Sequence, residues 1–337
     1  MIPFRKADFL NRLGILTKLG FSILQHKLTF VPFGVWATNR CNSRCLICNI
    51  WNKNPKTDLP AEIVRKILGD RAITRTTFFL LTGGELLLHP ECEEIMSLFR
   101  GRNYVLLTNA LLVERLIEVV RKYDVKRLSI SLDGSKETYK RVRGVDGYAC
   151  VERAVRELRH DTRIRIDYVI SPWNSRKDLV HVMKFCEKYQ IELGAEYYTD
   201  MEYLEIDRPP GHLYDVSDLI DHPYHRLYQE WVEGNLKMPC LSIFAKPSVR
   251  PNGDVMLCDQ KEVVLGNLHK ESLGEIWSSK RAFGIQRQYI SCNGCWSDCS
   301  RLFDLEILSW AKTFMSRRLL QRIFPDYDWS MILKYLN

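Results

Sequence analysis

The chain has 337 residues, of which 46% are hydrophobic, so it can hold one large domain with a smaller part appended. Its longest stretch without an acidic or basic residue is the 12 residues from Leu28 to Asn39, shorter than the roughly 20 of a membrane-spanning helix. The formal net charge is +8, but residues 1–30 carry +4 of it and residues 301–337 carry +2. The body of the chain therefore lacks the broad basic surface of a nucleic-acid-binding protein.

The chain contains eleven cysteines. Its first 20 residues mix charged with apolar side chains and lack the uninterrupted apolar segment of a secretion signal. We therefore expect a cytoplasmic protein whose thiols stay reduced. Metal ligation explains so many cysteines better than a disulfide scaffold does.

Residues 31–200 alternate between short apolar runs and amphipathic runs, separated by turn residues. Six strands in series, joined by helical crossovers, predict parallel pairing. The expected fold class is α/β, a partial (β/α)6 barrel with its site at the carboxyl ends of the strands. The pattern predicts strands at 31–38, 76–82, 103–108, 126–132, 163–170 and 192–199, and helices at 60–70, 90–100, 112–123, 148–160 and 175–189.

The remaining segments are shorter. Residues 201–238, which contain the turn-rich "DRPPGHLYD", indicate a linker or lid, and residues 239–300 a small cysteine-rich domain. Residues 1–30 and 301–337 are predicted to form basic amphipathic helices. These helices could pack back onto the barrel with basic outer faces, or lie on the anionic inner surface of a membrane, and the sequence leaves both alternatives open.

Three cysteines, Cys41, Cys45 and Cys48, follow the first predicted strand in a C-x3-C-x2-C pattern. A structural zinc site needs four closed ligands, commonly as two C-x2-C pairs. A four-iron cluster held by three thiolates leaves one iron open for an exogenous ligand, as electron delivery into a bound cofactor requires. The spacing favours this second interpretation.

The C-x3-C-x2-C loop after the first strand of a six-unit α/β barrel resembles the radical S-adenosylmethionine (SAM) superfamily. "LLTGGE", after the second strand, resembles the glycine-glycine-glutamate motif of that family. The resemblance implies that Gly83 and Gly84 let the backbone approach the cofactor and that Glu85 meets its amino group. The residue before the third cysteine is often aromatic in this superfamily and is Ile47 here.

Later strand ends extend the resemblance. "LLTN" places Asn109 at the end of the third strand, and "SISLDGSKETYKRVRG" places Ser131 and Asp133 at the end of the fourth, with Arg143 beyond them. The resemblance implies cofactor contacts for Asn109, Ser131 and Arg143, with Ser131 at the ribose and Arg143 at the methionine carboxylate. A planar guanidinium suits a carboxylate.

A second cysteine set lies between residues 240 and 299. "RPNGDVMLCDQKEVVLGNLHKESLGEIW" resembles the auxiliary-cluster extension called SPASM or, when shortened, twitch, whose full form carries seven cysteines for two clusters. This set has five cysteines, so one auxiliary [4Fe-4S] cluster is the expected count, although zinc fits four of them equally well on geometry. The first choice of ligands is Cys240, Cys258, Cys292 and Cys295, with Cys299 spare or replacing Cys292.

The resemblance implies an enzyme that reductively cleaves SAM to a 5'-deoxyadenosyl radical, which abstracts hydrogen from a substrate. The auxiliary cluster would accept an electron during oxidation, dehydrogenation or crosslinking of a peptide, a sugar or cyclitol, or a lipid-linked substrate. Such an enzyme needs an external electron donor of the flavodoxin or ferredoxin type. A zinc-binding interaction or nucleic-acid-binding protein with two cysteine clusters is the alternative from another functional class.

Overall fold

The computed structural model describes residues 32–206 and 213–336, so the helix predicted within residues 1–30 lies outside the described residues. All six predicted strands form, and each pairs in parallel with its neighbours along one sheet. Their bounds are β1 (Pro32–Trp36), β2 (Phe78–Thr82), β3 (Tyr104–Thr108), β4 (Arg127–Ser131), β5 (Arg163–Ile170) and β6 (Glu192–Tyr197). The predicted partial α/β barrel is confirmed.

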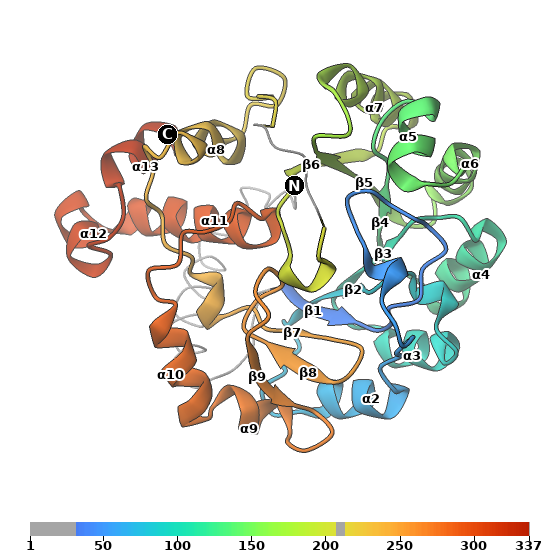
Figure 1. Ribbon diagram of the computed structural model, residues 1–337, viewed down its shortest axis with the longest axis horizontal. Helices are drawn as coiled ribbons and strands as arrows, with labels where there is room; N and C mark the ends of the chain where they lie inside the picture. The colour runs from blue at the N-terminus through green and yellow to red at the C-terminus, as the bar shows by residue number, and fades with distance from the viewer. Residues whose placement is uncertain (1–31, 207–212, 337) are drawn as a thin grey trace.

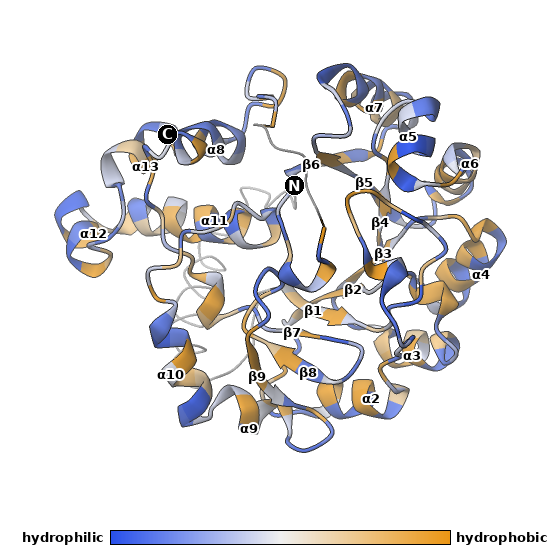
Figure 2. Cartoon of the chain, viewed as in Figure 1, coloured by the Kyte–Doolittle hydropathy of each residue, from blue (hydrophilic) through white to orange (hydrophobic). Residues whose placement is uncertain are grey.

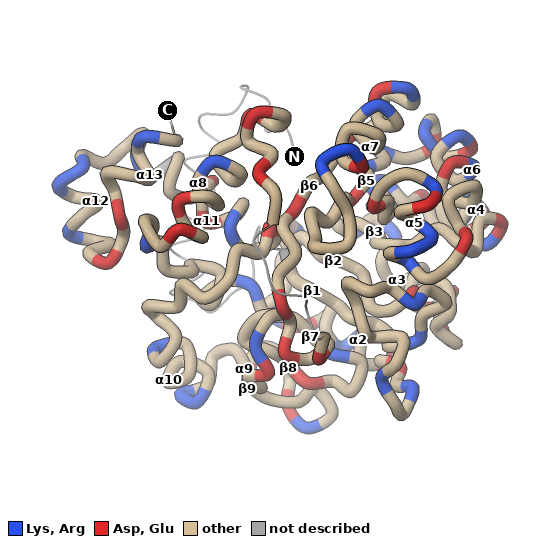
Figure 3. Tube along the Cα trace, turned by 45° about the horizontal axis from the view of Figure 1, so that its top comes forward, with Lys and Arg blue, Asp and Glu red and all other residues tan. Residues whose placement is uncertain are grey.

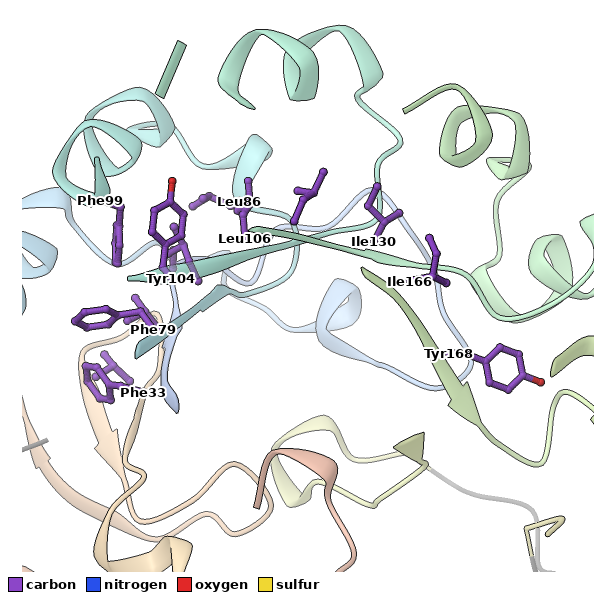
Figure 4. Packing of buried hydrophobic residues seen from close by; sticks show 14 of the residues in the cluster. Phe33, Phe79, Leu86, Phe99, Tyr104, Leu106, Ile130, Ile166 and Tyr168 are labelled. Carbon is purple, nitrogen blue, oxygen red and sulfur yellow. The ribbon is translucent and has the colours of Figure 1, made fainter. Parts of the chain in front are cut away.

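Helices cover the outer face of this sheet, as Figure 1 shows. All five predicted helices are present: α2 (Ala61–Gly69), α3 (Cys92–Phe99), α4 (Val113–Tyr123), α6 (Tyr148–Leu158) and α7 (Arg176–Tyr189). Strand side chains that face them are buried, among them Leu106, Ile130 and Ile166 (Figure 4). Because strand side chains alternate between faces, the intervening residues of β5, Arg165 and Asp167, face the barrel interior.

One barrel helix is missing from the predicted set. Helix α5 (Lys136–Arg143) follows β4 and begins at Ser135, whose hydroxyl accepts a hydrogen bond from the Thr138 N–H. Its sequence is short and strongly polar and has little apolar periodicity, so the pattern predicted no helix there. Arg143 therefore sits in the last helical turn, and Gly144 ends the helix with φ +67°.

The cysteine-rich part continues the barrel sheet. Strand β7 (Ser248–Val249) pairs in parallel with β1, and β8 (Asp254–Met256) and β9 (Val264–Asn267) extend the sheet in antiparallel fashion. The sheet order is β6-β5-β4-β3-β2-β1-β7-β8-β9. The predicted small domain therefore shares both a sheet and a hydrophobic core with the barrel.

Residues 201–238, which were predicted to form a linker or lid, contain two helices in their described part. The short 3-10 helix η3 (Glu202–Leu204) begins the segment, and helix α8 (Pro223–Val232) packs against Trp296 of the cysteine-rich part. The Tyr224 hydroxyl donates to the Trp296 carbonyl, and the Trp296 indole N–H donates back to the Tyr224 carbonyl. Tyrosine and tryptophan side chains pack well in a core. The aromatic residues of this segment therefore indicated packing, but its turn residues dominated the prediction.

The carboxyl-terminal region is helical as expected. Helices α9 (Leu273–Trp277) and α10 (Lys280–Gln288) precede α11 (Asp298–Phe314), α12 (Arg317–Ile323) and α13 (Trp329–Tyr335). The boundary predicted near residue 300 falls inside α11, while α13 buries Trp329 and Ile332 against the rest of the chain. In the part of the chain described, no helix combines the length and apolar character needed to cross a bilayer.

Candidate iron-sulfur and cofactor site

The loop of Cys41, Cys45 and Cys48 follows β1 and is held in place on two sides. On one side, Arg40 Nε lies 2.9 Å from Asp58 Oδ2. On the other, the Arg44 N–H donates to the Arg143 carbonyl (2.9 Å), at the end of α5. The loop conformation is therefore built by the protein and does not depend on the thiols alone.

Gly83 and Gly84 approach the cysteine loop itself. Gly83 has φ +143°, and a Cβ at Gly84 would lie 2.1 Å from the Arg40 carbonyl oxygen. The Gly84 N–H donates to the Thr38 carbonyl at 2.7 Å. The first function of the two glycines in this fold is thus to let the β2 turn pack directly on the backbone that carries Cys41.

Glu85 is buried (1% exposed) at the end of β2. Its Oε2 accepts hydrogen bonds from the Thr108 hydroxyl and the Asn109 N–H, both at 2.9 Å, and its Oε1 accepts one from the Leu87 N–H at 3.2 Å. Burial raises the pKa of this carboxyl. Three donors leave one of about four acceptor positions of a carboxylate free for a further N–H group.

Asn109 and Ser131 end neighbouring strand units but differ in their surroundings. The Asn109 amide donates to Asn42 Oδ1 (2.8 Å) and to Ser43 Oγ (3.2 Å), and lies 3.8 Å from Cys41 Sγ. Asn109 therefore orients the cysteine loop. The half-buried Ser131 hydroxyl has no hydrogen-bond partner among the described residues and can meet a ligand.

Arg143 lies beside the thiols and is already paired. Its Nε donates to Asp133, whose side chain is fully buried, and its Nη1 lies 3.8 Å from Cys45 Sγ. Burial opposes the charge of Arg143, but Asp133, Cys45 and Tyr139 together outweigh burial and raise the pKa of the guanidinium. The sequence placed Asp133 near the site, and the fold makes it the partner of Arg143.

Burial affects the three thiols strongly. It raises the pKa of Cys41 to about 11 and that of Cys48 to about 12, and it also raises the pKa of Cys45. None of these cysteines is in a disulfide. Since a metal ligates the thiolate, such buried thiols lose their protons when iron binds them.

Four cysteines of the second set, Cys240, Cys258, Cys292 and Cys295, come from three segments of the fold. The Cys240 N–H donates to the Cys292 carbonyl at 2.8 Å. Burial raises the pKa of Cys240 and Cys258, the latter to about 11, and the nearby Cys295 adds to both shifts. The charge of Cys292 in turn raises the pKa of Cys295. Charge interactions thus link Cys295 with Cys240, Cys258 and Cys292.

Cys299 has several charged neighbours. After burial, the largest influences on its pKa come from Asp298, Lys246, Glu196 and Asp259. It stands in the first turn of α11, on the side of the barrel interior.

Arg301 positions the second set, a role that the sequence did not indicate. It is fully buried in α11 and pairs with Asp304 at 3.2 Å. Its Nε donates to the Cys295 carbonyl at 3.0 Å, and its Nη1 donates to the Met238 carbonyl. One guanidinium therefore fixes the segments of Cys240 and Cys295. Only tertiary structure brings residues 238, 295 and 301 together.

A group of charged side chains fills the barrel interior between the two cysteine sets, and we call it the interior polar cluster. Arg165 Nη2 lies 2.6 Å from Asp167 Oδ1, and Lys246 Nζ lies 3.3 Å from Asp259 Oδ2. A Cβ at Gly194 would lie 2.9 Å from the Arg165 guanidinium carbon, so this glycine makes room for it. The cluster consists of Arg165, Asp167, Glu196, Lys246, Asp259 and Asp298.

Arg250 borders this cluster. Its guanidinium carbon lies 4.2 Å from the Trp36 ring centre and 4.5 Å from that of Tyr203. It donates to the Asp259 carbonyl at 3.0 Å, but its Nε and Nη1 have no partner among the described residues although they are buried. Because a buried unpaired N–H group is costly, these donors indicate a polar ligand in the interior.

The donor sets fit iron-sulfur clusters better than zinc. In the described ranges, no group of three or more His, Cys, Asp or Glu side chains is arranged around a single ion position. A structural zinc ion needs four ligands within about 2.3 Å of itself. Three free thiols in one loop, and four more from three segments, suit the wider four-iron cluster.

A parallel α/β partial barrel with a three-thiol loop at the end of β1 defines a class of proteins in which iron-sulfur chemistry acts on a cofactor bound at the strand ends. The model of the radical SAM superfamily matches residues 37–186, and that of the SPASM iron-sulfur cluster-binding domain matches residues 240–299. The chain belongs to the radical SAM superfamily and carries a SPASM domain. Its cofactors are accordingly SAM and iron-sulfur clusters.

Curated relatives resemble the chain over the barrel. A Fe-coproporphyrin III synthase from Methanosarcina barkeri is 26% identical over 184 residues, and a probable GTP 3',8-cyclase from Methanocaldococcus jannaschii is 27% identical over 199 residues. The matches take in 52% and 54% of this chain but 45% and 62% of those proteins. The chain therefore spans about half the length of these relatives.

Solved structures share the fold over more of the chain. SuiB from Streptococcus suis, bound to S-adenosylmethionine, has a TM-score of 0.62 at 16% identity, covering 81% of this chain and 72% of SuiB. The enzyme anSMEcpe with bound AdoMet and a peptide has a TM-score of 0.55 at 19% identity, covering 77% and 82%. At this level of identity the likeness concerns the fold.

Proposed function

We propose that the protein is a radical SAM oxidoreductase that oxidises, dehydrogenates or crosslinks a polar substrate. The observation that carries this proposal is the charged barrel interior between two thiol groups. Asp259 directly follows Cys258, while Trp36, which Arg250 covers, packs with Cys41 and Cys48. A substrate in this interior would lie within reach of both thiol groups.

The proposed cofactor contacts rest on the free bonding positions of the site. Cys41, Cys45 and Cys48 would hold a [4Fe-4S] cluster, which together with SAM supplies the 5'-deoxyadenosyl radical. Glu85 has one acceptor position left for the cofactor amino group, and Ser131 has a free hydroxyl for the ribose. Arg143 would offer its remaining N–H groups to the methionine carboxylate.

The proposed auxiliary site has four ligands, Cys240, Cys258, Cys292 and Cys295, and one [4Fe-4S] cluster that would accept an electron from the substrate radical. Cys299 would not be a ligand, because its neighbours are charged residues of the interior. The substrate's polar groups would bind Arg250 and the interior polar cluster. A hydrophobic chain alone would leave the buried Nε and Nη1 of Arg250 without acceptors.

Two partners follow from this chemistry. The cluster at Cys41, Cys45 and Cys48 must be reduced, so we propose an external donor of the flavodoxin or ferredoxin type. Such donors act in the cytoplasm, where we place the protein. The relatives named above act on small molecules, and anSMEcpe was solved with a peptide, so the substrate itself is left as a polar molecule of either kind.

The test is reductive cleavage of SAM by anaerobically reconstituted protein. We expect dithionite-reduced wild type to form 5'-deoxyadenosine and the Cys41→Ala/Cys45→Ala/Cys48→Ala variant to form none, while keeping about four of about eight irons. A variant with Cys92→Ala, a buried thiol in α3, is the matched control and should behave as wild type. Undiminished 5'-deoxyadenosine in the triple variant would refute the proposal.

A further inference from the structure

Helix α12 and the residues before it form a surface that differs from the rest of the molecule. Among the described residues, six large hydrophobic side chains are exposed, and three of them, Phe314, Leu319 and Ile323, fall within ten positions. They are 42%, 43% and 47% exposed. Figure 1 shows α12 at the outer edge of the protein, away from the barrel. We call this surface, residues 314–323, the α12 surface.

The same surface is basic. Arg317, Arg318 and Arg322 are exposed, and none of them forms an ion pair with any described residue. The nearest acidic residue that follows in sequence, Asp326, instead pairs with Lys237 at 3.8 Å. Figure 3 shows the basic positions along α12, and Figure 2 shows hydrophobic positions beside them. The surface thus offers unpaired positive charge next to apolar side chains.

Helical spacing arranges these residues in stripes. Leu320 is 1% exposed and anchors α12 to the protein. Leu319 and Ile323 are four positions apart and share one face, and Arg318 and Arg322 form a parallel stripe beside it. The outward side of helix α12 therefore carries an apolar stripe and a basic stripe next to each other.

We propose that the α12 surface docks on an anionic phospholipid bilayer. Guanidinium groups bind the phosphates of acidic headgroups, and the neighbouring leucine and isoleucine can enter the boundary between headgroups and acyl chains. Nucleic acid would match the arginines but not the exposed apolar stripe. The contact is peripheral and shallow, and it does not require a membrane-spanning helix.

The test is co-sedimentation of the full-length, cluster-loaded protein with vesicles. We expect binding to vesicles of phosphatidylglycerol and phosphatidylcholine, little binding to phosphatidylcholine alone, and loss of binding at 0.5 M salt. Each arginine contributes about fivefold to the partition coefficient, so Arg317→Gln/Arg318→Gln/Arg322→Gln should weaken it by roughly 100-fold. Leu319→Ser/Ile323→Ser should weaken it at least tenfold.

The matched control is Phe283→Ser/Ile290→Ser, which removes two equally exposed hydrophobic residues near α10 and should leave binding unchanged. Iron content and 5'-deoxyadenosine formation should be the same in all variants, which separates this proposal from the proposed function. Wild-type binding by both α12 variants would overturn the proposal. So would a dimer that Leu319→Ser/Ile323→Ser dissociates, because the surface would then be an interface between two copies of the chain.

Discussion

At the scale of single residues, Arg143 and Asp133 form a buried ion pair beside the cofactor site. Their side chains are 10% and 0% exposed. Removing one member of such a pair leaves an uncompensated buried charge, which commonly costs about 3 to 5 kcal/mol. Replacing either residue should therefore affect the stability of the fold around the cofactor site as well as any direct contact with the cofactor.

We expect Arg143→Ala to lower the free energy of unfolding of the cluster-free protein by about 3 to 5 kcal/mol. The double variant Arg143→Ala/Asp133→Ala should lose less than the sum of the two single variants, because neither charge is then stranded. Anaerobic urea unfolding of the three variants measures this coupling. Strict additivity would show that the two side chains do not stabilise each other.

Cys295 and Cys299 are four residues apart, and we expect their substitutions to have opposite results. Cys295→Ala should lose the auxiliary cluster, so that about four of about eight irons remain after reconstitution. Cys299→Ala should keep about eight. Iron analysis with visible and electron paramagnetic resonance spectra distinguishes them. Loss of the auxiliary cluster in Cys299→Ala would show that this thiol is a ligand after all.

At the scale of elements, the turn after β2 and the loop after β1 act as one unit. We expect Gly84→Ala to displace the cysteine loop, because its Cβ would lie 2.1 Å from the Arg40 carbonyl oxygen. The variant should lose the cluster at Cys41, Cys45 and Cys48 but keep the auxiliary one, leaving about four irons. The control is Gly69→Ala at the end of α2, where no atom lies within 4 Å of the new Cβ.

Helix α8 should make the protein sensitive to acid. Burial lowers the pKa of His225 to about 4, against about 6.5 in the unfolded chain. Below pH 6.5 the unfolded state binds more protons, so stability falls as the pH drops from about 6.5 to 4. Between pH 7 and pH 4.5 the free energy of unfolding should fall in both proteins. We expect this fall to be about 2 to 3 kcal/mol smaller in His225→Phe than in wild type. Chemical unfolding of the cluster-free protein at several pH values measures this difference, and equal pH dependence in both proteins would contradict it.

At the scale of the whole molecule, barrel and SPASM domain share one sheet. Strand β7 pairs with β1 through Gly34↔Ser248 and Val35↔Val249, and both parts contribute to one hydrophobic core. Removal of β7 to β9 would expose the edge of β1, whose unpaired backbone groups are a template for aggregation. The two family matches are therefore parts of one folding unit.

We expect the cluster-free chain to unfold in a single calorimetric transition whose calorimetric and van't Hoff enthalpies agree. A fragment that ends at residue 238 should fail to give a soluble, cooperatively unfolding protein. Differential scanning calorimetry and size-exclusion chromatography measure both. Two separate transitions, or a stable fragment, would show that the barrel folds independently.

The sequence by itself determined the barrel and the identity of the first cysteine site. Apolar alternation in 163–170 and the helical period in 112–123 act over neighbouring residues, so β5 and α4 could be predicted within a residue or two. Three cysteines in eight positions are likewise a local signal. The loop at Cys41, Cys45 and Cys48 lies where parallel strands must place it, at a carboxyl end.

Only the tertiary structure decided what lies between distant segments. The pairing of β7 with β1, the contact of Arg301 with the segments of Cys240 and Cys295, and the place of Cys299 among interior charges all join residues far apart in the chain. Helix α5 was missed because its outward positions are polar and its burial comes from partners such as the cysteine loop. Local patterns specify elements, whereas the neighbours of a side chain depend on how all elements pack.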